Sequence, residues 1–152
     1  MDHAPCAVLI VHSTEWNLRM IKDVLLNKFT LVMAGGALGS LLRYLVQGWG
    51  QALTKGTFPI GTLAVNVIGC FAIGVLNMLF AERIPIRMEY RVGLTVGILG
   101  GFTTFSSLGW ESFSMVNEGQ GLRAMMNMLL SVTLGFMAVW LGYRLAERWI
   151  GV

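Results

Sequence analysis

The sequence predicts an all-α membrane protein with four transmembrane helices in each subunit. Hydrophobic residues make up 55% of the 152-residue chain and charged residues only 12%, whereas a soluble domain is usually about one quarter charged. In addition, three long runs of residues carry no charge. So few ionised side chains cannot cover a water-exposed surface, and a lipid bilayer is therefore the expected surrounding.

The uncharged runs define the last three predicted helices. They cover residues 56–81, 92–110 and 124–143, and each is close to or above the roughly 20 residues that cross a hydrocarbon core about 30 Å thick. With their flanks, the predicted helices cover about residues 58–81, 90–115 and 122–147.

The first predicted helix, about residues 28–49, rests on a shorter uncharged run over residues 29–42. It reaches spanning length only by continuing past Arg43. This is acceptable because an arginine near a helix end can extend its charged head to the membrane interface. The connections between runs are too short for a soluble domain, so we expect a single transmembrane domain over residues 28–150.

Residues 1–27 differ from the rest because they carry five charged residues and only a short apolar run. Met20 begins a stretch typical of a membrane-protein start. The preceding residues are therefore expected to be a start-site artefact or a disordered N-terminal extension. His3, Cys6 and His12 can be read as metal ligands, but a tail without metal is the favoured interpretation.

The distribution of basic residues predicts an orientation. With four spans, both ends of the chain lie on one side of the membrane, and that side receives eight of the eleven Lys and Arg residues. The other side receives Arg43, Lys55 and Arg123. The positive-inside rule then places the termini in the cytoplasm, provided that the orientation is fixed. Because the basic residues flank the spans instead of clustering, nucleic-acid binding is not expected.

Glycines recur at four-residue spacing in two predicted helices. Gly35 and Gly39 share one face of the first helix, and Gly93, Gly97 and Gly101 share one face of the third. Such a stripe lets a neighbouring helix approach closely. We therefore expect close helix contacts there. A four-helix unit of this size is also small to enclose a pathway alone, which favours an oligomer.

The centre of the third helix, residues 100–107 (GGFTTFSS), is predicted to break. Paired glycines and paired threonines are poor material for a helix interior. In a membrane the freed backbone groups must meet protein, water or an ion. Freed carbonyls can hold a hard cation such as sodium, and freed amides and hydroxyls can face an anion. The alternative is a kinked helix whose Thr and Ser side chains bond back to its own carbonyls.

Uncharged polar residues also sit at membrane depth in the other helices. Asn66 lies in the middle of the second helix, and Asn127 and Ser131 share one face of the fourth. A buried amide needs a partner, so Asn66 is expected to face the interior or a pathway. The span centres carry no Asp, Glu, Lys or His, which argues against proton-coupled transport and against an intramembrane enzyme. Neutral donors and the positive ring edge of Phe105 suit a small dehydrated ion.

Three stretches of the sequence are similar to the Fluc (CrcB-type) fluoride channel family. They are residues 35–44 (GGALGSLLRY), residues 61–69 around Asn66, and residues 100–106 (GGFTTFS), and the similarity covers about residues 20–146. The resemblance implies an antiparallel, dual-topology dimer with two fluoride pores. It also implies a structural Na+ at the dimer interface, held by the backbone carbonyls of Gly100 and Thr103 of each subunit.

The resemblance also implies roles for individual residues. It makes Asn66 a pore donor and Phe105 the first of two pore phenylalanines. The implied pore lining is Asn66, Thr104, Phe105, Ser106, Leu108, Asn127 and Ser131, and the implied pore mouth contains Glu111 and Arg43.

Two features depart from the family pattern. Leu108 stands where the family has its second pore phenylalanine, and leucine has no polarised ring edge. The charge bias of eight against three is also strong for a subunit that inserts both ways. Both features suit one half of a heterodimer whose partner is a paralogue, although a homodimer remains open.

The function implied by the resemblance is passive, fluoride-selective conduction across the cell inner membrane, which exports fluoride from the cytoplasm and relieves its toxicity. One alternative is a non-conducting or accessory subunit of a heterodimeric fluoride channel. Another is a small four-helix multidrug-type transporter, which would require a carboxylate at the centre of a span.

Overall fold

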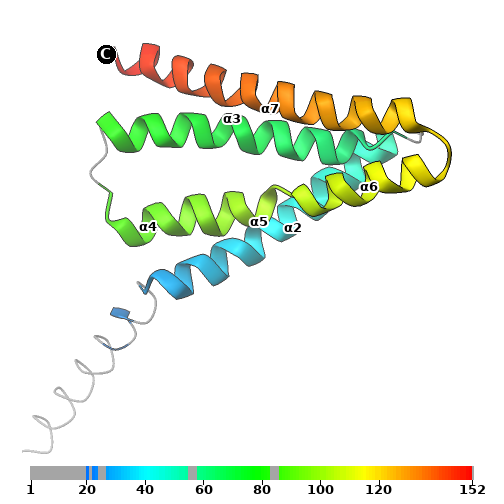
Figure 1. The fold of residues 1–152 in the computed structure, drawn as a ribbon. Helices are drawn as coiled ribbons and strands as arrows, with labels where there is room; N and C mark the ends of the chain where they lie inside the picture. Colours follow the sequence, from blue (N-terminus) through cyan, green and yellow to red (C-terminus); the bar gives the residue numbers. More distant parts are fainter. Residues whose placement is uncertain (1–19, 21, 24–26, 55–57, 83–85, 152) are drawn as a thin grey trace, which may run out of the picture.

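The computed structural model describes residues 20, 22–23, 27–54, 58–82 and 86–151, and all regular elements in these ranges are helices (Figure 1). The interpretations of His3, Cys6 and His12, and most of the expected N-terminal extension, lie outside the described residues. The same holds for Lys55 and for Arg83, which contribute to the charge count.

Four helical segments are long and apolar enough to cross a membrane. The first two are α2 (Lys28–Thr54) and α3 (Ile60–Glu82), and the last is α7 (Gly121–Ile150). The third is composite and is made of α4 (Met88–Val92), η1 (Gly93–Leu99), α5 (Gly100–Phe102) and α6 (Phe105–Asn117). The chain is therefore an all-α, multi-pass membrane protein, as predicted, although α2 continues five residues beyond its expected end.

Successive spanning segments run in opposite directions, so their ends lie at two opposite ends of the bundle (Figure 1). The starts of α2 and α4 lie at the same end as the last residues of α3 and α7. In the view of Figure 1, α3 and α7 lie side by side, while α2 crosses the composite segment diagonally. This arrangement brings the middle of α2 against η1 and α5.

The glycine stripes make the crossing of α2 with the composite segment close, which confirms the prediction. A methyl group added at Gly35 would lie 2.7 Å from the carbonyl oxygen of Gly93, and one added at Gly101 would lie 2.6 Å from that of Gly36. One added at Gly39 would overlap the carbonyl oxygen of Ile98. Backbone therefore packs directly on backbone here, which only glycine permits.

The side chains on α7 are arranged with small residues inside and large residues outside. Trp140, Phe136 and Leu129 on this helix are exposed. Since lipid tails are as apolar as leucine, large side chains gain nothing by facing inward, and helix contacts favour small residues. The buried positions of α7 are Ala124, Asn127, Ser131, Gly135, Ala138, Gly142 and Ala146.

The third segment breaks as predicted, but the break is confined to two residues. Thr103 has φ −77° and ψ 156°, and Thr104 has φ −149° and ψ 116°, so both are extended. Gly100 and Gly101, which were expected to contribute to the break, are helical in α5. For Gly101 the reason is the contact with Gly36: this glycine serves close packing, and the chain leaves the helix only after Phe102.

Candidate ion pathway at the helix break

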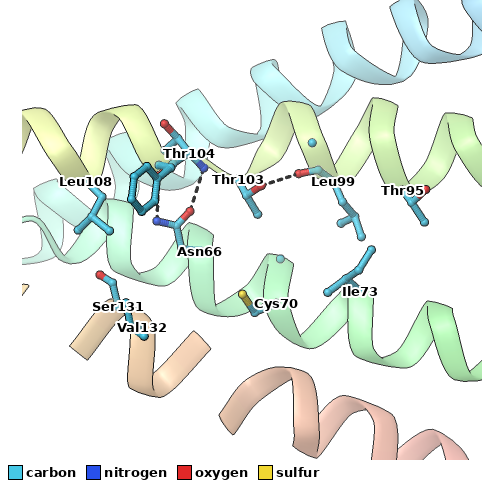
Figure 2. Close-up of a pocket in the computed structure, with 13 residues that line it drawn as sticks. Asn66, Cys70, Ile73, Thr95, Leu99, Thr103, Thr104, Leu108, Ser131 and Val132 are labelled. Atoms are coloured by element: carbon cyan, nitrogen blue, oxygen red, sulfur yellow. Dashed lines mark hydrogen bonds between the residues drawn. The ribbon is translucent and has the colours of Figure 1, made fainter. Parts of the chain in front are cut away.

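An open pocket of about 370 Å³ lies beside the break, between α3, the composite segment and α7 (Figure 2). Its walls are mostly apolar, with a few uncharged polar side chains, and Asn66 and Ser131 face the break from α3 and α7. None of its lining residues carries a charged side chain. The lining consists of Asn66, Gly69, Cys70, Ile73, Thr95, Leu99, Gly100, Thr103, Thr104, Phe105, Leu108, Ser131 and Val132.

Asn66 contacts the break through both ends of its amide (Figure 2). Its Nδ2 donates to the carbonyl oxygen of Thr104 at 3.1 Å, and its Oδ1 accepts from the Thr104 N–H at 2.9 Å. The expectation that this side chain faces the interior is confirmed. However, its partner in the structure is the backbone of the composite segment.

Thr103 is held by two other elements. Its N–H and its hydroxyl both donate to the carbonyl of Leu99, each at 2.9 Å, so the threonine bonds back one turn. Its carbonyl receives Arg43 Nη1 from α2 at 3.5 Å, a long contact. Arg43, expected at the pore mouth, thus points its guanidinium at the break.

Thr104 also begins the next helix. It is the N-cap of α6, and its hydroxyl accepts from the Ser107 N–H at 3.2 Å and donates to the Ser107 hydroxyl at 3.0 Å. The hydroxyl of Ser106 lies 3.4 Å away. This capping pattern satisfies one of the unpaired donors at the start of a helix. The Thr104 side chain is therefore committed to the helix terminus.

The two candidate aromatic positions differ in their surroundings. Phe105 is 83% exposed, whereas Leu108 is only 5% exposed and packs within the pocket near Ser131 and Val132. Both line the same pocket. Phe105 therefore presents its ring outward from the subunit, while Leu108 forms part of the inner wall.

The polar residues of α7 are buried against α6. Asn127 is fully buried, and its Nδ2 donates to the hydroxyl of Ser112 at 3.1 Å. The Asn127 Oδ1 and the Ser131 hydroxyl are both buried without a hydrogen-bond partner among the described residues. Ser112 was not among the predicted residues. Ser112 lies four residues after Leu108, and both are buried on α6. This spacing is the sequence feature that could have identified Ser112.

A second, more polar pocket of about 510 Å³ contains Glu111. One carboxylate oxygen of Glu111 accepts a short hydrogen bond from the Thr62 hydroxyl, which in turn accepts from Gln47 Nε2 at 3.0 Å. Sequence reasoning missed Thr62 and Gln47, although each lies one helical turn from a predicted residue, Asn66 and Arg43 respectively. Glu111 is thus tied to α3 and α2 at the end of the bundle where α6 finishes.

These features define a four-span helical membrane protein with a pocket of uncharged polar groups beside a break in one span. The family of CrcB-like proteins, described as Camphor Resistance (CrcB), matches residues 30–143. The chain belongs to this family.

Individual relatives cover most of the chain. A protein of Solibacter usitatus (strain Ellin6076) named "Fluoride-specific ion channel FluC" is 49% identical over 124 residues, which are 80% of this chain and 99% of that protein. Proteins of the same name from Geobacter metallireducens and Rhizobium etli are 44% and 47% identical. The matched residues cover 74% and 72% of this chain, and 91% and 87% of those two proteins, respectively.

Proposed function

We propose that this chain forms a passive, fluoride-selective ion channel that exports fluoride from the cytoplasm. The likeness to a protein named fluoride-specific ion channel along 99% of its length carries this proposal. The names of these relatives favour an ion channel over an enzyme and over a multidrug-type transporter.

The pocket chemistry is compatible with a small anion. Its polar groups are amides and hydroxyls, which can donate to an anion without binding it as tightly as a fixed positive charge would. The buried hydroxyl of Ser131 has no hydrogen-bond partner among the residues that the structure describes, and the outward ring of Phe105 offers a positive edge. In this proposal Asn66, Thr104, Ser106 and Asn127 line the pathway with them, and Leu108 forms an apolar wall.

A second subunit completes the pathway in our proposal. The pocket is open, and the exposed Gly100 and Phe105 both line it. A subunit laid over this face would cover the ring and enclose the pocket. An antiparallel arrangement follows the resemblance to the Fluc family. Crosslinking in membranes and mass measurement in lipid would test the dimer, and a purely monomeric chain would contradict it.

The residues at the break fit a structural Na+. The extended ψ of Thr103 turns its carbonyl out of the helix, and Arg43 Nη1 makes a long contact with this oxygen. Gly100 is exposed beside it. In a dimer, the carbonyls of Gly100 and Thr103 from two subunits would supply hard oxygen ligands and hold the two breaks together. Thermal stability should then be higher in sodium than in N-methylglucamine, and equal stability would contradict the site.

The partner is proposed to be a paralogue, with this chain as one half of a heterodimer. Leu108 supports this proposal, since it gives the pocket an aliphatic wall where the family has an aromatic ring. The chain would insert with the end of the bundle that carries the start of α2 and the end of α7 in the cytoplasm. Robust fluoride flux from this chain expressed alone would favour a homodimer instead.

The decisive experiment is fluoride efflux from liposomes that contain the purified chain, with chloride efflux as the control. We expect fluoride efflux above that of protein-free liposomes, a further rise when a paralogue is co-expressed, and no chloride efflux. Equal flux of both anions, or no flux even with a co-expressed paralogue, would overturn the proposed function.

A further inference from the structure

We infer that Asn66 is a positioning residue that holds the break in the composite segment open through the backbone of Thr104. This role differs from that of a fluoride ligand. The contact between Asn66 and Thr104 does not depend on the proposed function. Only the expected effect of this contact on ion flux rests on it.

The geometry of an extended residue explains why one side chain can do this. In an extended residue, the N–H and the C=O point to the same side, and in an antiparallel sheet such a residue exchanges both bonds with one partner. Thr104 is extended, and its N–H and carbonyl meet the Oδ1 and Nδ2 of Asn66 at 2.9 and 3.1 Å. The side-chain amide thus takes the place of a neighbouring strand.

The lipid environment makes this pairing necessary. A break at membrane depth frees backbone groups that lipid cannot pair, and each unsatisfied group costs several kcal/mol. Thr103 has its N–H paired with Leu99 and its carbonyl contacted by Arg43. The N–H and the carbonyl of Thr104 are both paired with Asn66. Without it, the N–H and the carbonyl of Thr104 would both be left unpaired, and the break would no longer be held in its extended form.

The neighbouring turn of α3 supports the same register. A methyl group added at Gly69 would overlap the Thr103 side chain, so Gly69 leaves the space that this threonine occupies. Gly69 lies three residues after Asn66 and therefore on the same face of α3. One face of α3 thus accommodates Thr103 and pairs Thr104.

Residue type discriminates positioning from ligand binding. An amide has two N–H donors and one acceptor oxygen. A glutamine keeps all of these groups and can still offer an N–H to a mobile ion in the pocket. Its extra methylene, however, displaces the amide from the fixed N–H and carbonyl of Thr104. Positioning therefore predicts that Asn66→Gln fails, whereas ligand binding predicts partial function.

The test is hydrogen–deuterium exchange at the Thr104 amide, measured with residue-level fragmentation on the full chain in lipid nanodiscs. In Asn66→Ala and Asn66→Gln we expect exchange at Thr104 to accelerate by roughly tenfold, the factor for one lost hydrogen bond of ordinary strength. Asn77→Ala, an exposed site on the same helix, is the matched control and should leave Thr104 unchanged.

Fluoride efflux from the same preparations separates the outcomes. Faster exchange together with reduced flux supports the positioning role. Reduced flux with unchanged exchange at Thr104 in either variant would overturn it and make Asn66 a ligand. If Asn66→Ala does not fold, Asn66→Gln carries the comparison. A wild-type chain without fluoride flux would sink the proposed function but would leave the exchange result for Thr104 intact.

Discussion

At the scale of single residues, the polar groups in this bundle differ in what they already bind. Asn66 and Thr104 are engaged with the backbone and with the start of α6. Asn127 is engaged with Ser112 through one end of its amide. Ser131, by contrast, has a buried hydroxyl without a partner among the described residues. Among the predicted pore residues, Ser131 is therefore the one whose hydroxyl is most available to bind an ion.

Removal of that hydroxyl should separate function from stability. Since Ser131→Ala breaks no side-chain hydrogen bond among the described residues, we expect the melting temperature in detergent to stay within a few degrees, which corresponds to less than about 1 kcal/mol for a chain of this size. Fluoride efflux should fall several-fold. Thr133→Val, on the exposed side of α7, is the control. Full flux in Ser131→Ala would remove this residue from the pathway.

A substitution at Leu108 tests whether the missing aromatic ring at this position limits fluoride flux. We expect Leu108→Phe to raise fluoride efflux by the chain alone, because it restores a positive ring edge and the adjoining pocket of about 370 Å³ can take the added atoms. Overpacking a buried site usually costs about 1–3 kcal/mol, so a melting curve accompanies the flux assay. Leu108→Met is the control. A folded Leu108→Phe protein with unchanged flux would show that the ring is not what this subunit lacks.

At the scale of elements, the composite segment combines a wide helical turn with a break. η1 is π-helical, and the N–H of Gly100 points back to the carbonyl of Thr95, five residues earlier. Such wide turns are often found at functional sites. Directly after it, α5 packs on α2 through glycine, and the chain then opens at Thr103. The position of the break therefore depends on the contact between α2 and this segment.

Two glycines on α2 allow this dependence to be measured. A methyl group at Gly39 would overlap the backbone of Ile98, whereas one at Gly36 has nothing within 4 Å. We expect Gly39→Ala to destabilise the protein by about 1–3 kcal/mol and to lower flux. Gly36→Ala should be neutral or stabilising by up to about 1 kcal/mol, from better helix propensity. Thermal melts in detergent compare the two, and equal melts would contradict the backbone contact.

At the scale of the whole molecule, basic residues gather at one end of the bundle. Lys28, Arg87, Arg91, Arg144 and Arg148 lie where α2 and α4 begin and α7 ends. Arg91 also stacks on the Phe80 ring at 5.2 Å. Among the described residues, the opposite end carries Arg123, and Arg43 is directed to the break. Because basic loops stay in the cytoplasm, this difference favours a single orientation.

Orientation can be read with a cysteine in the turn between α6 and α7. In a background without Cys6 and Cys70, we expect Glu118→Cys, which is exposed, to react with a membrane-impermeant maleimide added outside cells. Arg87→Cys should react only after the cells are opened. Labelling of both sites from outside would show that the subunit inserts both ways and would remove the charge argument for a paralogous partner.

The sequence alone determined the class of this protein, its four spans, the glycine stripes and the presence of a break. These follow from local composition: apolar length predicts a span, and paired glycines and threonines weaken a helix wherever they occur. The resemblance carried by residues 35–44, 61–69 and 100–106 led to the family that the comparison identifies over residues 30–143.

Only the tertiary structure decided what each polar group binds. It placed the break at Thr103 and Thr104 because Gly101 is held in helix against Gly36, and it turned Asn66 to the Thr104 backbone across 38 residues of chain. It also joined Gln47 and Thr62 to Glu111. Such pairings depend on how helices distant in sequence cross, and a local pattern of residue types carries no information about that crossing.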